Sequence, residues 1–346
     1  MFQSDLPSRL GFRFASRWRN LRFHFSKASW PDLYAYEQQR SGRKHLPWLD
    51  LLHASWHHGA SFEDYYLLRF FDKTRAQRRE YLTTSLYYEL ERQHNQLDKA
   101  MVMRDKYLFA VHFRDLLGRQ SWSWPELQQL DPTSTPPKRL VIKHRFGVKG
   151  QDIHFPTAPF ASWADVCEVI QSLGQSDHYL CESYLEQHPE LARLNPGTVN
   201  TLRIMTWREG SNVEIWGVIL RVGQGEGPDN WAQGGLGVWV GDDGRLSGEG
   251  VPKNPFMPRS SVTPTTGQPL NGFQVPYLPQ ARQLAIESAL RLPEVRSVGW
   301  DVAISATGPC LIEGNDRWSH QFLQCVQGQA SRHLADAVCD MYQVYE

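Results

Sequence analysis

Two acidic residues and one amide stand near the end of the chain, where short apolar runs predict strands. Glu313 and Asn315 follow the run CLI in GPCLIEGNDRW, and Asp301 lies twelve residues before Glu313 in VGWDVAIS. Because side chains alternate along a strand, we expect Leu311, Glu313 and Asn315 on one face and Ile312 on the other. The short turn ATG between the two runs predicts a hairpin, which would place Asp301 beside Glu313.

Two carboxylates and an amide oxygen are ligands that suit Mg²⁺, a cation that also binds the phosphates of nucleotides. A magnesium site is therefore one interpretation of these three residues. The alternative is that Asp301 and Glu313 are unrelated strand-end acids that pair with nearby arginines such as Arg317. The spacing alone does not decide between the two.

Three cationic residues earlier in the chain would suit a phosphate. Lys143 lies in the predicted strand RLVIKH, before a loop with Gly147 and Gly150. Glycines let backbone N–H groups approach phosphate oxygens, although the loop lacks the G-x-x-x-x-G-K-[ST] pattern and a plain hairpin also fits it. Lys106, on a predicted helix, could equally be a solvated side chain. Arg203 interrupts the apolar strand NTLRIMTW and therefore requires a carboxylate or a ligand phosphate as partner.

The elements that must position these residues fall into two parts. Up to about residue 120, apolar residues recur at three- and four-residue spacing, which predicts helices, and SFEDYYLLRFF begins with Ser61 as a candidate N-cap. After the turn-rich segment 131–139, β-branched and aromatic runs separated by glycine-rich turns indicate strands, with helices at WADVCEVIQSLG and PQARQLAIESALRL. The pattern predicts a helical N-terminal region followed by an α+β body.

The composition is typical of a globular protein without a dominant charge. The 346 residues include 37 basic and 37 acidic ones, which argues against a nucleic-acid partner. No apolar stretch reaches the length of about 18 residues that a membrane span needs, and no signal-peptide core follows the N-terminus. Five scattered cysteines favour reduced thiols and a cytoplasmic location.

The first 30 residues are basic and carry several aromatic residues. They contain one acid, Asp5, and the following cations: Arg9, Arg13, Arg17, Arg19, Arg22 and Lys27. An ordinary basic helix surface explains this pattern. The alternatives are peripheral contact with an anionic membrane, at its inner face, and an organelle transit peptide.

The order of these features resembles the ATP-grasp superfamily, and most narrowly its sugar-transfer-associated branch, which is related to the glutamate ligases. The resemblance covers about residues 95–320 and depends chiefly on NTLRI, GWDVAI and LIEGN, with SFEDYY as a further match. It implies two α+β lobes with ATP between them, preceded by a mainly helical region. The expected boundaries are 1–100 for the helical region, 101–180 for the small lobe and 181–346 for the large lobe.

For the nucleotide, the resemblance implies a role for each matching residue. Lys106 and Lys143 match the lysines that hold the phosphates, and the loop with Gly147 and Gly150 matches the one that closes over them. The segment CESYL matches the hinge between the lobes. Its Glu182, Ser183 and Leu185 would border the adenine, and Glu190 is the nearest candidate for the ribose.

For the chemistry, the resemblance implies that Asp301, Glu313 and Asn315 bind two Mg²⁺ ions and that Arg203 lies near the transferred phosphate, with Lys143. The implied reaction joins a carboxylate to an amine through an acyl phosphate, on a small molecule, glycan or peptide. A kinase acting on a hydroxyl and a non-catalytic nucleotide-binding protein are the alternatives. Compared with the D-alanine ligase branch, Gly299 replaces an arginine and Asp316 begins the segment that replaces a Pro-Gly turn, so the resemblance does not define the acceptor.

Overall fold

The structure is a computed structural model that describes residues 6–147, 153–156, 159–225 and 229–337, with the backbone alone for residues 6–13. The chain forms two compact units. The first, here called the helical unit, consists of residues 1–94, 251–259 and 319–346. The second, here called the two-sheet unit, consists of residues 95–250 and 260–318. The C-terminal helices thus belong with the N-terminal ones, although the sequence placed them in the large lobe.

The helical unit contains short helices around an aromatic core. Buried Leu51, Phe62, Tyr66 and Phe70 form the centre of this core. Glycines in the left-handed conformation end three of the described helices, as at Gly59. The described helices are α1 (Leu6–Lys27), α2 (Trp30–Ser41), α3 (Trp48–His58), α4 (Phe62–Leu67), α5 (Arg75–Arg79), α6 (Thr84–His94), α13 (His320–Gln327), α14 (Arg332–Asp336) and the 3₁₀ turn η1 (Phe70–Asp72).

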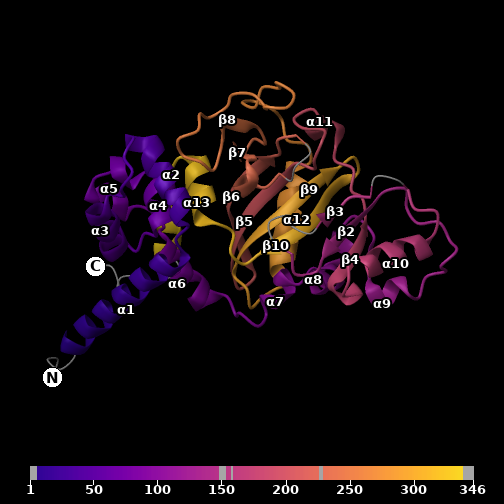
Figure 1. Cartoon of the computed structure of the whole chain (residues 1–346), viewed down its shortest axis with the longest axis horizontal. Coiled ribbons are helices and arrows are strands. Elements are labelled where there is room, and N and C mark those ends of the chain that lie inside the picture. The colour runs from indigo at the N-terminus through magenta and orange to yellow at the C-terminus, as the bar shows by residue number, and fades with distance from the viewer. Residues whose placement is uncertain (1–5, 148–152, 157–158, 226–228, 338–346) are drawn as a thin grey trace. The chain divides into compact units, whose positions relative to one another are not determined.

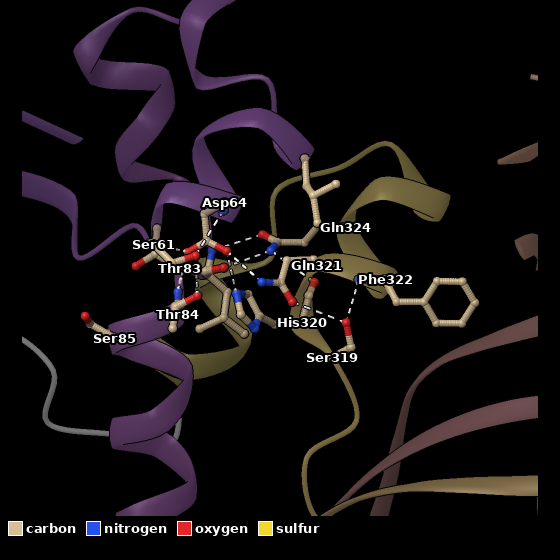
Figure 2. Close-up of polar contacts among 12 residues, drawn as sticks. Ser61, Asp64, Thr83, Thr84, Ser85, Ser319, His320, Gln321, Phe322 and Gln324 are labelled. Carbon is tan, nitrogen blue, oxygen red and sulfur yellow. Dashed lines mark hydrogen bonds and ion pairs between the residues drawn. The ribbon is translucent and has the colours of Figure 1, made fainter. Parts of the chain in front are cut away.

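A buried aspartate joins the N-terminal helices of this unit to the C-terminal ones (Figure 2). Asp64 is the third residue of a capping box with Ser61, whose N–H donates to Asp64 Oδ2 at 2.9 Å. The N–H of Thr84 donates to the same oxygen at 2.7 Å. The other oxygen accepts from His320 Nε2 at 3.1 Å and from Gln321 Nε2 at 2.9 Å. These contacts lower the pKa of Asp64 although its burial opposes this, so the side chain is held as a carboxylate.

We expect Asp64→Asn to destabilise the protein by about 2–3 kcal/mol, because the amide can accept fewer of the four hydrogen bonds and presents its own N–H groups to donors. Urea unfolding followed by circular dichroism measures this difference. Asp32→Asn, at an exposed acid in the first turn of α2, is the control and should cost about 0.5 kcal/mol. Equal effects of the two substitutions would show that the Asp64 contacts contribute nothing specific.

The two-sheet unit contains one large and one small antiparallel sheet (Figure 1). The large sheet has the order β10-β9-β5-β6-β7-β8, and the small sheet has the order β1-β4-β2-β3. The strands are β1 (Ser121–Ser123), β2 (Leu140–His144), β3 (Ile153–His154), β4 (Tyr179–Ser183), β5 (Thr201–Glu209), β6 (Asn212–Val222), β7 (Leu236–Val240), β8 (Leu246–Val251), β9 (Ser297–Ser305) and β10 (Gly308–Asn315).

Helices cover one face of each sheet. Helix α12 packs on the large sheet, where Trp300 and Leu311 are fully buried in the core. Trp163 and Ile170 of α10 pack against Ile142 of the small sheet. The helices of this unit are α7 (Met101–Arg104), α8 (Lys106–His112), α9 (Trp124–Leu127), α10 (Trp163–Ser172), α11 (Pro189–Ala192) and α12 (Leu278–Leu290), with 3₁₀ turns η2 (Arg114–Leu116), η3 (Ser176–His178) and η4 (Trp231–Gln233).

The expected α+β architecture with a helical N-terminal region is confirmed by these elements. None of the helices in the described part of the chain combines the length and the apolar character needed to cross a membrane.

Candidate active site

The hairpin of β9 and β10 brings the two predicted acids together. Glu313 lies opposite Asp301 and Asn315 opposite Gly299, which confirms the predicted pairing. The register shifts between Leu311 and Glu313, so that a β-bulge forms at Ile312. Leu311 therefore faces the core, whereas Ile312 packs with Ala303 on the face that carries Asp301. The expectation that Leu311 shares a face with Glu313 is wrong, because the extra residue interrupts the alternation of side chains.

Asp301 is fully buried between two arginines. Arg203 Nη2 donates to Asp301 Oδ2 at 3.0 Å, and its Nε donates to Oδ1. Arg221 Nη2 lies 2.9 Å from Asp301 Oδ2. Burial alone would raise the pKa of Asp301, but the two guanidinium groups lower it to about 2. The partner that the sequence required for Arg203 is therefore a carboxylate of the neighbouring strand.

Arg221 is a site residue that the sequence interpretation missed. It lies on β6 and donates to Thr201 Oγ1 from Nε at 2.9 Å, and its Nε lies 3.4 Å from Asp229. Asp229 in turn accepts from the N–H of Thr201 at 3.0 Å. The signal was present, because Arg221 interrupts the apolar strand VEIWGVILRVG as Arg203 interrupts its own.

Glu313 is the acid of the pair whose charge is less compensated. Its pKa is raised by burial and by the adjacent Asp301, against the opposing effect of Arg221 and Arg203. Asn315 Nδ2 lies 3.4 Å from Glu313 Oε1 and the same distance from the carbonyl of Gly299. A half-buried carboxylate beside a second one is a place that favours an added cation.

These donors fit a magnesium ion that takes few ligands from protein. Both oxygens of Asp301 already accept from arginines, which leaves Glu313 and the amide oxygen of Asn315 as the groups with free acceptor capacity. Among the described residues, no group of three or more His, Cys, Asp and Glu side chains is placed to hold a metal ion. Mg²⁺ commonly binds through one or two carboxylates and completes its shell with water and phosphate.

On the small sheet, Lys143 is held by a buried carboxylate. Its Nζ lies 2.6 Å from Glu182 Oε2, and Arg119 Nη2 lies 2.8 Å from Glu182 Oε1. Arg119 also donates to the carbonyl of Leu311 on β10 at 2.8 Å, so it contacts both sheets. Arg119 was not predicted, and its position before β1 gave no signal. The carboxylate of Glu182 therefore forms ion pairs with both Lys143 and Arg119.

Stability should fall in acid because of Glu182. Burial opposes its ionisation, but Arg119 and Lys143 lower its pKa from 4.5 to about 2. A lowered pKa stabilises the fold above the ordinary value of that group, and this stabilisation is lost as the pH falls from 4.5 towards about 2. We expect Glu182→Gln to be less stable at neutral pH and to lose less stability on acidification, as measured by urea unfolding at about pH 6, 4 and 3. Parallel pH profiles would contradict this assignment.

Lys106 lies at the start of α8 and contacts the loop that follows β2. It opens α8 after the N-cap Asp105, and its Nζ donates to the carbonyl of Gly147. Burial lowers the pKa of Lys106, Glu313 opposes this effect and Lys143 adds to it. Glu313 and Lys143 are thus close enough for their charges to act on Lys106. Gly150 lies outside the described residues.

The remaining candidates lie on β4, beside β10 and on α11. Leu185 packs with Cys310 and Ala303 in a small apolar cluster that Ile312 borders. Ser183 accepts from the N–H of Gln120 at 3.0 Å. Glu190 lies on α11, half-exposed and 2.8 Å from Arg193, and in the described part of the chain no hydrogen bond or ion pair joins its carboxylate to the other candidates.

A family model described as sugar-transfer associated ATP-grasp matches residues 86–340. The match extends over more than half of the chain, and the chain belongs to this family. The expected ATP-grasp fold is thereby confirmed. No curated protein matches the chain.

Solved structures of low sequence identity are also similar to the chain. A protein assigned to the ATP-grasp superfamily from Archaeoglobus fulgidus is 13% identical, with 72% of this chain and 60% of that chain covered and a TM-score of 0.40. D-alanine-D-alanine ligase from Helicobacter pylori is 9% identical, with 74% and 68% covered and a TM-score of 0.40. L-amino acid ligase from Bacillus licheniformis is 11% identical, with 63% and 41% covered and a TM-score of 0.36. The chain thus spans about 60% of the length of the first of these proteins.

Proposed function

We propose that this protein is an ATP-dependent ligase that joins a carboxylate to an amine through an acyl phosphate. The observation that carries the proposal is that Arg119 joins Glu182, the partner of Lys143, to β10, the strand that carries Glu313 and Asn315. Two cations facing a carboxylate–amide pair suit a nucleotide triphosphate with its divalent cation. Membership of the ATP-grasp family supports the same assignment.

In the proposed reaction, an oxygen of the substrate carboxylate bonds to the γ-phosphorus of ATP, and the bond from that phosphorus to the β–γ bridging oxygen breaks. ADP leaves, and an acyl phosphate remains. The amine nitrogen then bonds to the acyl carbon, phosphate leaves, and the amine loses a proton. The protein needs no covalent intermediate of its own, so its part is to orient the reactants and to neutralise charge.

The residues divide these tasks. Lys143 and Lys106 neutralise phosphate oxygens from the side of the small sheet. Glu313 and Asn315 would hold Mg²⁺, which supplies further compensation of the phosphate charge when bound. Both oxygens of Asp301 accept from arginines. Asp301 would therefore help to hold one or two ions only after an ion has replaced one of these arginines. Arg203 is proposed to act near the transferred phosphate through its position beside Asp301.

We propose that the hinge segment CESYL and the residues near it bind the nucleotide base and the ribose. The apolar cluster of Leu185, Ala303 and Cys310 offers a surface for an adenine ring. Ser183, next to Glu182, would border the same ring through backbone groups. Glu190 remains the proposed ribose ligand, and its half-exposed carboxylate is held by Arg193.

We further propose a carboxylate carried by a small molecule, a glycan or a peptide, as in polysaccharide synthesis, and no nucleic-acid partner. A cytoplasmic location is proposed from the cysteine usage. Contact of the basic N-terminus with the inner face of the membrane is supported by α1, where Phe14 is 62% exposed and Trp18 is 52% exposed beside the arginines.

Release of ADP tests the proposal when candidate carboxylates are supplied with and without an amine. Hydroxylamine converts an acyl phosphate to a hydroxamate, so a ligase should give hydroxamate in step with ADP. A kinase would release ADP and phosphorylate a hydroxyl without any hydroxamate. ATP binding without release of ADP on any carboxylate would favour the non-catalytic alternative.

A further inference from the structure

A pocket in the helical unit lies apart from every residue assigned to the ligase. It has a volume of about 270 Å³ and is lined by the segment that follows α4, by residues 251–259 and by α13. All of its lining residues belong to the helical unit. This volume is close to the lower limit for pockets that bind small organic molecules.

The pocket is positively charged. Among the described residues that line it there is no carboxylate, and there are four cations: Arg69, Lys73, Lys253 and Arg259. Two of these form ion pairs: Arg69 lies 2.7 Å from Asp72, and Lys253 lies 2.8 Å from Glu63. Lys73 and Arg259 make no ion pair with any residue that the structure describes, and the one acid that acts on the charge of Lys73, Asp72, is itself paired with Arg69.

Lys73 is placed where a bound anion would be most effective. Its side chain is half-buried, and its Nζ lies 5.1 Å from the centre of the Tyr81 ring. Burial and the neighbouring Arg69 both lower the pKa of Lys73. Removal of water strengthens the attraction between an ammonium group and an anion, so Lys73 is suited to bind one.

The bottom and walls of the pocket add no negative charge. Cys325 on α13 donates its S–H to the carbonyl of Leu67 at 3.3 Å. Burial raises the pKa of this thiol to about 12, so it remains neutral. Leu68, Pro255 and Met257 provide apolar surface beside the cations, and Met257 is 56% exposed.

We propose that this pocket binds the phosphate monoester group of a small organic molecule. A phosphomonoester carries a charge of about −2 at neutral pH, which balances the charges of Lys73 and Arg259. Its three terminal oxygens accept charge-assisted hydrogen bonds from both side chains, while the organic part contacts the apolar wall. This inference goes beyond the ligase reaction and does not depend on it.

Calorimetric titration of the full chain tests the proposal, both with and without ADP and Mg²⁺, to separate binding at the pocket from binding at the nucleotide site. The probes are glucose 6-phosphate, inorganic phosphate and glucose. We expect glucose 6-phosphate to bind and glucose not to bind. Lys73→Met and Arg259→Gln should each weaken binding about tenfold, the effect of losing one charge-assisted hydrogen bond. The matched control is Arg75→Gln, at an exposed cation of α5 that does not line the pocket, which should leave binding unchanged.

Binding of inorganic phosphate as tight as that of the ester would support the anion site and identify free phosphate as its ligand. Weaker binding of inorganic phosphate would support the ester. Absence of binding by both probes would overturn the proposal, as would equal binding by wild type and Lys73→Met. This failure is distinguishable from failure of the ligase assignment, because the latter is decided by the hydroxamate assay, which does not depend on the pocket.

Discussion

Glu313→Gln is expected to lower the rate of ADP formation at least about 100-fold, which corresponds to about 3 kcal/mol of transition-state stabilisation. The amide keeps the size of the side chain but removes the negative charge that would hold a divalent cation. Because the pKa of Glu313 is raised by burial and by Asp301, its neutral replacement should not destabilise the fold. Steady-state ADP release and the melting temperature together measure the two parts of this expectation.

The matched control is Glu249→Gln, at an exposed acid of β8. It removes the same charge from the same unit and should leave the rate unchanged. A variant Glu313→Gln that forms ADP at nearly the wild-type rate would exclude the proposed metal ligand. A large loss of melting temperature would instead assign a structural role to Glu313.

Unlike Glu313→Gln, Asp301→Asn should destabilise the fold. We expect it to lower the free energy of unfolding by about 3–5 kcal/mol. The substitution leaves Arg203 and Arg221 buried without the carboxylate that both contact. An amide accepts fewer hydrogen bonds and cannot balance two guanidinium charges. Urea unfolding at neutral pH measures the loss, and the variant should accumulate poorly on expression.

An exposed ion pair provides the comparison for Asp301. Asp242 is fully exposed and lies 2.9 Å from Arg282, so Asp242→Asn should cost at most about 1 kcal/mol. If Asp301→Asn were as mild as this control, the arginines would have to find other partners, and the description of Asp301 as the centre of a buried ion network would be wrong.

Much of the two-sheet unit could be predicted because its signals are local. Alternating apolar runs and short turns located strands β5, β6, β9 and β10. The turn between β9 and β10 was enough to predict that Asp301 and Glu313 are paired. Such pairs depend on a few consecutive residues, which is why spacing along the chain predicted them.

The contacts that the sequence did not predict join distant segments. His320 reaches Asp64 across 256 residues, and nothing in either segment specified the other. Arg119 contacts both Glu182 and the Leu311 carbonyl from a turn without any pattern. The roles of the individual site residues remain proposals, because spacing indicates which side chains share a face but not which of them a ligand contacts.

The bulge at Ile312 fixes the distance between an apolar surface and the proposed metal ligand Glu313. In a regular strand, consecutive side chains would serve opposite faces, whereas here Ile312 and Glu313 both serve the face of Asp301. A surface for a flat ring and a ligand for a charged group are then separated by a single peptide unit of about 3.8 Å. In the proposed site, the spacing between this apolar surface and the metal ligand is consequently set by the backbone of the bulge and does not depend on the conformation of a loop.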